Sequence, residues 1–467
     1  MPPCRQSLAL VAVSNARLRF VLHGRAVKEA KERTIPRQSH PRGRRPRGPR
    51  TKSNARSVAA MVLAAVERGE ARSGDTLSRE MNRGNLSDPR DRGLATELVY
   101  GSLRWQRQLD HALRPWVKQG LGKLEPMARA FLRIGAYQIL HLDRIPAPIA
   151  VSATQDAARA AGMGRVTGLI NGVLRRVTEA GFTAPEGQTN AAIAMRWSLP
   201  TWVVSALRVA YGDHAVETEA EALKSRAPNT VRPTLTRGGF DALRESWKDT
   251  PFTLDDGPHG TGIITGPGDP FATDAFHAGL FVPQDPASLH VVDLVEASDG
   301  MRVLDLCAGR GIKATALADR GAEVLAVDLE ERKLEGCDAL AKSLGLSDRI
   351  TTQVADGTAP DLNLGSFERV LVDAPCTGLG TLRRHPEIAW RRRPDDVGRL
   401  GELQQKLLAT GARHVAPGGR LVYAVCTFGA DEGPPSALDG FTEISAVVSR
   451  PSDQLDAFQA TVWQRDL

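Results

Sequence analysis

Several hallmarks of other protein classes are missing from this sequence. No apolar run approaches the roughly 18 residues that a membrane-spanning helix requires, so we expect no membrane span. The 467 residues include only five cysteines, and their spacing fits neither a zinc site nor a disulfide framework. We therefore expect no bound metal, and unpaired thiols are typical of a reducing compartment, which predicts a cytoplasmic protein. No phosphate-binding P-loop is present, which argues against ATP as a ligand.

The positive charge of the chain is confined to its first residues. The formal net charge is +7, but residues 1–56 carry 15 Lys and Arg against 2 acidic residues, so the remainder is mildly acidic. Overall basicity therefore says nothing about nucleic-acid binding by the folded part. Three interpretations of residues 1–52 stay open: a disordered phosphate-binding arm, an organellar transit peptide, or a start placed upstream of the true one, near Met61.

Residues 53–182 have the pattern of an all-helical domain. Apolar side chains recur three and four positions apart, and few β-branched runs interrupt them. Asp88 followed by Pro89 is typical of a helix start, with Asp88 as the cap and Pro89 in the first turn. The Ile-Pro-Ala-Pro stretch at residues 145–148 breaks the pattern, and residues 183–190 form a polar linker.

The rest of the chain divides into two predicted parts. Residues 193–290 indicate a mixed α/β connecting subdomain that closes with a loop rich in Gly and Pro over residues 257–270. From residue 291 to residue 467 strand and helix patterns alternate, which predicts a parallel, doubly wound sheet. The predicted strands of this sheet are residues 302–306, 323–327, 349–354, 369–373 and 420–425.

Two of these strands end close to a cysteine. The run Val-Leu-Val-Asp-Ala-Pro-Cys ends at Cys376, and the run Leu-Val-Tyr-Ala-Val-Cys ends at Cys426. Active sites of open parallel sheets lie at the carboxyl ends of the strands, so this pair indicates thiol chemistry. A free cysteine can instead be a small buried hydrophobe, which is the simpler interpretation of Cys307 and Cys337.

A cofactor crevice is predicted beside the thiols. After residues 302–306, Gly309 and Gly311 let the backbone approach a ligand at the N-terminus of the next helix. The motif is not the complete GxGxxG of dinucleotide-binding proteins, so alone it is weak evidence. Acidic residues following successive strands strengthen it, because such carboxylates can accept ribose hydroxyls or an adenine amino group. These acids are Asp305, Asp328, Asp356 and Asp373.

The segments around the two cysteines closely resemble the Sun (Fmu) family of bacterial 16S rRNA 5-methylcytosine methyltransferases. The resemblance rests on Asp-Ala-Pro-Cys-Thr-Gly-Leu-Gly-Thr-Leu-Arg-Arg-His-Pro-Glu-Ile at residues 373–388 and Tyr-Ala-Val-Cys-Thr at residues 423–427. Residues 97–104, 144–146 and 168–175 are similar to that family's helical domain, which is itself similar to the antitermination factor NusB. The resemblance implies a multi-domain protein, with an all-α NusB-like N-terminal domain and an α/β Rossmann-like methyltransferase domain over residues 291–467.

The resemblance also implies roles for individual residues. Cys426 would be the nucleophile that adds to C6 of a cytosine, Cys376 would assist product release, Asp373 would hold the edge of the base, and Lys313 would lie near base and cofactor. In DNA cytosine methyltransferases the Pro-Cys thiol is the nucleophile instead, and the sequence does not exclude that exchange. S-adenosylmethionine would be the cofactor, bound by Asp305, Cys307, Ala308, Gly309, Gly311, Lys313, Asp328, Asp356 and Asp373.

The implied partner is 16S rRNA or a precursor of the small ribosomal subunit, acted on by a monomer. The target base must leave its stack to reach such a site, which favours a loop or partly melted RNA. Five arginines flank the Pro-Cys loop and are predicted to contact phosphates. They are Arg383, Arg384, Arg391, Arg392 and Arg393.

The chain also departs from the family pattern. The family's first cofactor motif usually reads Cys-Ala-Ala-Pro-Gly-Gly-Lys-Thr, whereas residues 307–314 read Cys-Ala-Gly-Arg-Gly-Ile-Lys-Ala, which predicts weaker cofactor binding. The Glu-Glu-Asn that often follows the second cysteine is replaced by Asp-Glu-Gly at residues 431–433, and the tail beyond is short. An alternative function is a non-catalytic RNA-binding assembly factor, although such a protein is expected to lose at least one of Cys376, Cys426, Asp373 and Lys313. A small-molecule or protein methyltransferase would not explain two thiols at strand ends.

Overall fold

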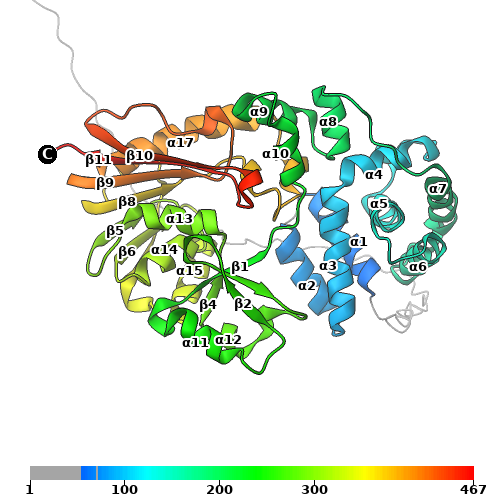
Figure 1. The fold of residues 1–467 in the computed structure, drawn as a ribbon, viewed down its shortest axis with the longest axis horizontal. Coiled ribbons are helices and arrows are strands. Elements are labelled where there is room, and N and C mark those ends of the chain that lie inside the picture. The colour runs from blue at the N-terminus through cyan, green and yellow to red at the C-terminus, as the bar shows by residue number, and fades with distance from the viewer. Residues whose placement is uncertain (1–53, 70–71) are drawn as a thin grey trace, which may run out of the picture. The chain divides into compact units, whose positions relative to one another are not determined.

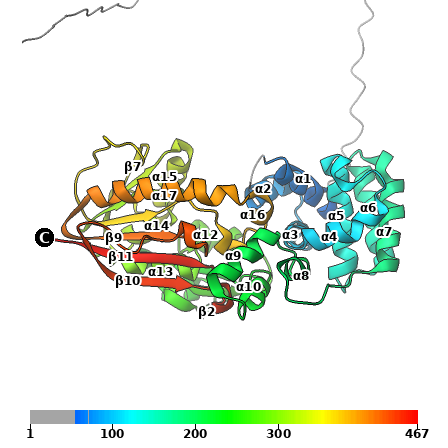
Figure 2. The same cartoon turned by 90° about the horizontal axis from the view of Figure 1, so that it is seen from above.

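The computed structural model describes residues 54–69 and 72–467, so the predictions for residues 1–52, and Cys4 with them, lie outside the described residues. Figures 1 and 2 show a helical N-terminal part followed by two regions that contain sheets. No helix among the described residues is long and apolar enough to cross a bilayer.

The N-terminal part is all-helical, as predicted. Its helix α3 begins at Pro89, and the carboxylate of Asp88 accepts a hydrogen bond from the backbone N–H of Arg90 at 2.8 Å, which confirms the predicted cap. Helix α5 lies among the other helices and is buried along most of its length. The helices are α1 (Ala55–Glu67), α2 (Ser73–Arg83), α3 (Pro89–Arg104), α4 (Gln106–Leu113), α5 (Pro126–His141), α6 (Ala147–Ala160) and α7 (Thr167–Ala180).

Three further helices and a small sheet connect this part to the C-terminal sheet. The helices are α8 (Asn190–Arg196), α9 (Thr201–Tyr211) and α10 (Val216–Ala222). The sheet is antiparallel, in the order β2-β3-β1-β4. The predicted loop over residues 257–270 is wrong in part, because β3 lies inside it and pairs with both β1 and β2. The strands and their helices are β1 (Asn229–Pro233), α11 (Gly239–Ser246), β2 (Thr253–Asp256), β3 (Gly262–Thr265), α12 (Asp274–His277) and β4 (Phe281–Pro283).

The C-terminal sheet has seven strands in the order β10-β11-β9-β8-β5-β6-β7. The five predicted strands are present and parallel, but the wholly parallel sheet is wrong: β11 pairs antiparallel with β9, and β10 pairs antiparallel with β11. The tail that looked short in sequence supplies these two strands. The seven strands are β5 (Arg302–Asp305), β6 (Glu323–Asp328), β7 (Ile350–Val354), β8 (Phe367–Asp373), β9 (Val415–Val425), β10 (Phe441–Ser449) and β11 (Phe458–Arg465).

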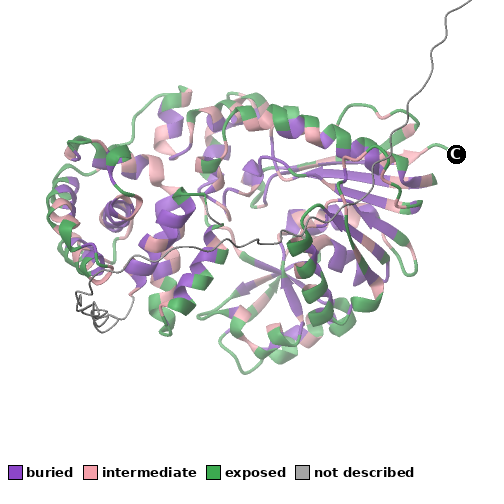
Figure 3. Ribbon diagram, turned by 180° about the vertical axis from the view of Figure 1, so that it is seen from behind, coloured by how far each residue is buried: buried purple, intermediate pink, exposed green. Residues whose placement is uncertain are grey.

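Helices cover both faces of this sheet, so its central strands are buried (Figure 3). Alternate residues of the strands pack on opposite faces, Val370 and Val372 against α17 and Leu371 against the cluster that contains α13, α14 and α15. Burial on both faces fixes the strand register, and thereby the position of the loops that follow each strand. The helices are α13 (Pro286–Val295), α14 (Ile312–Ala318), α15 (Glu331–Leu344), α16 (Ile388–Arg391) and α17 (Asp395–Arg413).

Candidate active site at the carboxyl edge of the sheet

The loops after β8 and β9 bring the two strand-end cysteines together. These strands are parallel neighbours, with Asp373 opposite Ala424, so the loops leave the same edge of the sheet side by side. The Sγ atoms of Cys376 and Cys426 lie 3.2 Å apart, and both thiols are free. Cys376 is only 7% exposed, whereas Cys426 is partly exposed. Cys426 is therefore the thiol that a bound molecule can reach more easily.

The electrostatics of the pair also differ between its members. The hydrogen bond to Cys426, followed by burial, raises the pKa of Cys376 well above the usual value of a thiol. Cys376 is thus held as a protonated thiol beside the sulfur of Cys426. A neutral S–H next to a second sulfur can donate a hydrogen bond to a thiolate there.

A partly buried ion pair lies next to the thiols. Nζ of Lys313, in the first turn of α14, is 2.6 Å from Oδ2 of Asp373 at the end of β8. Burial lowers the pKa of Lys313, but the charge of Asp373 and its hydrogen bond outweigh burial, so the net pKa is raised. Nζ also lies 5.4 Å from the centre of the Phe458 ring on β11. The cation is therefore fixed between the end of the sheet and the first helix of the cofactor loop.

The cofactor loop after β5 depends on its glycines. Gly311 has φ 78°, and a Cβ atom there would lie 2.3 Å from Sγ of Cys337, so only glycine fits. Gly309, with φ 57°, has open space where a side chain would project. Its backbone N–H donates to Oδ2 of Asp328 at 3.0 Å, which ties the loop to the end of β6. The crevice predicted from the strand-end acids therefore has a defined backbone.

The remaining predicted cofactor residues differ in burial. Asp305 is 1% exposed, and burial, followed by the charge of Asp373, raises its pKa to about 7. Burial raises the pKa of Cys307 well above the usual value, and Ala308 donates its N–H to Val327 O at 2.9 Å. Asp356 is exposed and accepts hydrogen bonds from the backbone N–H and hydroxyl of Thr358.

The structure separates the five predicted RNA-binding arginines into two groups. The first group donates hydrogen bonds inside the protein. Nε and Nη2 of Arg384 both donate to Oδ2 of Asp285. Arg383 is 2% exposed, and its Nη1 donates to Leu455 O. Arg392 donates to Thr377 O and to Cys376 O, both at 3.0 Å, so it supports the Pro-Cys loop from within. Arg391 and Arg393 are exposed.

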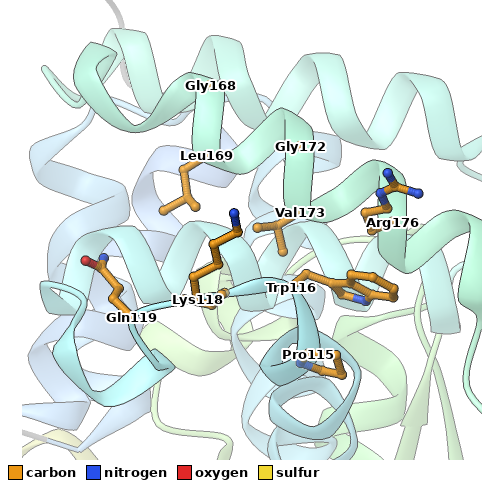
Figure 4. A pocket seen from close by; sticks show the side chains of 10 residues that line it. Pro115, Trp116, Lys118, Gln119, Gly168, Leu169, Gly172, Val173 and Arg176 are labelled. Atoms are coloured by element: carbon orange, nitrogen blue, oxygen red, sulfur yellow. The ribbon is translucent and has the colours of Figure 1, made fainter.

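A hollow of about 590 Å³ lies in the helical part, away from the residues described above (Figure 4). Trp116 and Lys118 line it from the segment after α4, and Arg176 lines it from α7. Its lining contains no thiol, acid or histidine, and its titratable side chains are Lys118 and Arg176. Among residues 54–69 and 72–467, no group of three or more His, Cys, Asp or Glu is arranged to hold a metal ion.

Comparison with known proteins identifies the family. Residues 292–442 match the model of 16S rRNA methyltransferase RsmB/F, and residues 53–179 match the NusB family. The ribosomal RNA small subunit methyltransferase B of Thermus thermophilus is 40% identical over 379 residues, covering 81% of this chain and 85% of that protein. The enzyme of the same name from Escherichia coli is 32% identical over 385 residues, covering 80% and 86%. This chain belongs to the RsmB/F family of 16S rRNA methyltransferases.

Solved structures support the same fold. The crystal structure of PH0851 superposes with a TM-score of 0.76 at 20% identity, covering 88% of this chain and 99% of that one. A methyltransferase homologue from Pyrococcus horikoshii superposes with a TM-score of 0.51 at 20% identity, covering 60% and 100%. The family matches assign the helical part to a NusB domain and the mixed sheet to an RsmB/F methyltransferase domain, a family that depends on S-adenosylmethionine.

The residues at the cofactor crevice fit S-adenosylmethionine. Asp328, at the end of β6, carries a carboxylate of the kind that accepts ribose hydroxyls, and Gly309, whose N–H it holds, leaves open space for a ligand against the backbone. The exposed side chains of Leu329 and Val354, at 66% and 52%, stand beside the acids that follow β6 and β7 and offer apolar surface for a purine ring. Although residues 307–314 differ from the usual family motif, Gly309, Asp328 and Lys313 are all present.

Sequence reasoning missed four residues that support the thiols or line the crevice. Phe458 on β11 contacts Lys313, Leu329 follows Asp328, and Val354 lies two residues before Asp356. The sequence feature that could have identified all three is an apolar side chain at the end of a strand. Glu432 is completely buried between the two cysteine loops. The sequence feature that could have identified it is an acidic residue six positions after Cys426, in the segment where this chain departs from the family pattern.

Proposed function

We propose that this protein transfers a methyl group from S-adenosylmethionine to C5 of a cytosine in small-subunit rRNA, through a covalent adduct between Cys426 and C6. The observation that carries the proposal is the pair of free thiols 3.2 Å apart beside the Lys313–Asp373 ion pair. A single cofactor-dependent methyl transfer to an oxygen or nitrogen nucleophile needs neither thiol. Addition to C6 and the later elimination need one thiol nucleophile, and a second thiol beside it can assist the elimination.

The thiols have separate parts in this scheme. The partly exposed Cys426 adds its sulfur to C6, which makes C5 nucleophilic, and C5 takes the methyl group that S-adenosylmethionine supplies. A base then removes the C5 proton, the C6–S bond breaks, and Cys426 leaves as a thiolate. Cys376, whose pKa is raised first by its hydrogen bond to Cys426 and then by burial, stays a thiol and hydrogen-bonds the departing sulfur. The assignment follows from exposure: the buried Cys376 is the poorer nucleophile for a bulky base.

Lys313 and Asp373 act on the base and on the thiols. Asp373 accepts a hydrogen bond from the exocyclic amine of the cytosine, while Lys313 holds its carboxylate in place. The Lys313 cation also favours a thiolate nearby, because opposite charges attract strongly in a site that excludes water.

RNA contact is proposed for exposed basic residues outside the catalytic pair. Arg391 and Arg393 follow the Pro-Cys loop and are exposed, and Lys118 and Arg176 flank Trp116 at the hollow in the NusB domain. Cations with an adjacent aromatic ring can bind both the phosphates and an unstacked base of RNA.

The test is nucleoside analysis of rRNA after incubation with the full chain and S-adenosylmethionine. Naked 16S rRNA and small subunits are supplied separately, with wild type, Cys426→Ala and, as a thiol outside the pair, Cys337→Ala. We expect 5-methylcytosine with wild type and Cys337→Ala, and none with Cys426→Ala. If wild type methylates a position other than C5, or if Cys426→Ala keeps its activity, the proposed chemistry is wrong.

A further inference from the structure

A buried carboxylate joins the two cysteine loops from behind. Glu432 is 0% exposed, and its side chain lies between Thr377, which follows Cys376, and Thr427, which follows Cys426. Its Oε1 accepts from the backbone N–H of Thr377 at 2.6 Å, and its Oε2 accepts from the hydroxyl of Thr377 at 2.5 Å. The hydroxyl of Thr427 lies 3.4 Å from Oε2 and 3.0 Å from the hydroxyl of Thr377.

This environment is unusual for an acidic side chain. Apart from the threonines, the hydrogen-bond partner of the Glu432 side chain among the described residues is the amide of Gln404, at 3.4 Å, so every donor is neutral. Burial raises the pKa of Glu432, although the hydrogen bonds from Thr377 oppose that rise. Burying a carboxylate without a cation costs free energy, and the hydrogen bonds that it accepts from the buried N–H and hydroxyl of Thr377 offset that cost. The carboxylate therefore serves a specific structural purpose at these loops.

Its position indicates that purpose. Gln404 also donates to Pro375 O, and Arg392 donates to Cys376 O and Thr377 O, so the backbone on both sides of Cys376 is held by side chains of α17 and its preceding segment. Glu432 contacts both loops, which are also joined directly by the two threonine hydroxyls and by the hydrogen bond from Gly380 N–H to Cys426 O at 3.0 Å. One carboxylate thus bonds the residue after each thiol, and through it contributes to the separation of the two sulfurs.

We propose that Glu432 is a positioning residue that sets the distance and orientation between Cys376 and Cys426. The inference rests on the proposed function, because the two sulfurs need a defined separation only if both take part in one reaction. Loss of the carboxylate removes the acceptor shared by Thr377 and Thr427 and lets the segments next to the two thiols shift relative to each other. The S–H of Cys376 then no longer points at the sulfur of Cys426, and the reaction slows without any change in how cofactor or RNA is bound.

The decisive variant is Glu432→Gln, which keeps the size of the side chain and replaces one acceptor oxygen by a donor. Asp431→Asn is the matched control, because Asp431 is the preceding residue and is exposed. We expect kcat of Glu432→Gln to fall by about 100-fold, the loss that a displacement of about 1 Å causes at a reacting centre. The KM for RNA and the affinity for S-adenosylhomocysteine should change less than about threefold, because the residues that bind them are elsewhere in the site.

A second readout does not depend on methyl transfer. The rate at which iodoacetamide alkylates Cys426 at neutral pH, followed by peptide mass spectrometry, should fall in Glu432→Gln and not in Asp431→Asn. Should Glu432→Gln fail to fold, Thr427→Val and Thr427→Ser replace it. The valine variant should lose kcat and alkylation rate, and the serine variant, which keeps the hydroxyl, should recover most of both.

The outcomes separate this inference from the proposed function. Wild-type kcat in a folded Glu432→Gln protein would overturn the positioning role, as would a loss that falls equally on cofactor affinity, KM and thermal stability. If wild type makes no 5-methylcytosine, the proposed function fails by itself. The alkylation rates would then overturn the positioning role if they are equal in wild type and Glu432→Gln, and support it if they differ.

Discussion

The two halves of the active edge of the sheet are built differently. The loops after β8 and β9 carry the thiols and are held by Glu432, Gln404 and Arg392, with exposure of 0% at Glu432 and 7% at Cys376. The loops after β6 and β7 face solvent, where Leu329 is 66% exposed and the side chain of Asp356 is bonded to Thr358 within its own turn. The thiol-bearing half is therefore held in place without a ligand, whereas the half that follows β6 and β7 is exposed to solvent.

The difference follows from what each half must do. A covalent reaction needs reacting atoms within a few tenths of an ångström of their working positions, so its groups are locked by packing and hydrogen bonds. A cofactor that is bound and released in each cycle needs a crevice that ligand can enter. We therefore expect substitutions in the first half to act on rate and stability, and substitutions in the second half to act on affinity.

The largest effect is expected where the two halves meet, at the Lys313–Asp373 pair. Lys313→Met leaves the partly buried carboxylate of Asp373 without its cation, which should cost at most about 3 kcal/mol of unfolding free energy, the lower end of the range for a buried pair. Methyl transfer should also be lost. Urea unfolding and a methylation assay measure the two effects, with the exposed Lys342→Met on α15 as control. A destabilisation no larger than that of the control would mean that the pair is not electrostatically coupled.

An effect of similar size, but dependent on pH, is expected at Asp305. Its folded pKa is raised to about 7, chiefly by burial, above the value of 3.8 for a free carboxyl, so the folded state prefers the protonated acid. Stability is therefore greatest at low pH and is lost as pH rises through this window, on the order of 1 kcal/mol for each pH unit, and the loss ends above about 7.

Asp305→Asn cannot ionise and should lack this dependence. Its unfolding free energy relative to wild type should rise between about pH 4 and pH 7 and then stay constant. Urea unfolding at a series of pH values gives the comparison, with Asp356→Asn, on the exposed half, as control. Parallel curves for wild type and Asp305→Asn would show that the acid ionises normally in the folded protein.

The smallest effect is expected at Arg310, in the divergent part of the cofactor loop. Its Nη2 is 3.1 Å from Oδ2 of Asp75 on α2, and the side chains are 63% and 53% exposed. An exposed pair contributes about 0–1 kcal/mol, so Arg310→Ala should weaken binding of S-adenosylhomocysteine less than about fivefold, and Asp75→Asn should do the same. Calorimetry at low and high salt tests this. A loss of tenfold or more would place Arg310 among the direct ligands.

The sequence predicted the strands and the thiols well because both depend on local pattern. Runs such as residues 369–373 are apolar on both faces, and parallel strands bring their carboxyl ends to one edge, so Cys376 and Cys426 could be placed together without coordinates. Strands β10 and β11 were missed because the expectation of a short tail left residues 441–465 unassigned. As a result, one contact with the Pro-Cys loop was not predicted: the N–H of Ala457, just before β11, donates to Gly380 O.

What depends on distant partners could not be predicted. The guanidinium of Arg384 meets Asp285, 99 residues earlier in the chain, and Glu432 meets Thr377, 55 residues earlier. A run of arginines has the same sequence whether it faces phosphate or a buried carboxylate, and only tertiary packing separates the two. For the same reason the sequence did not reveal that Arg383 and Arg392 donate hydrogen bonds to backbone carbonyls, or that Arg391 and Arg393 are exposed.

The most direct test of the account is to trap the covalent adduct and identify the attached residue. Cys376→Ala removes the thiol assigned to release, so after incubation with S-adenosylmethionine and small-subunit rRNA it should accumulate a protein–RNA adduct. Peptide mass spectrometry should then place a 5-methylcytidine on Cys426, and the double variant Cys376→Ala/Cys426→Ala should form none. An adduct that instead accumulates in Cys426→Ala and maps to Cys376 would exchange the roles of the two thiols and contradict the assignment made from their exposure.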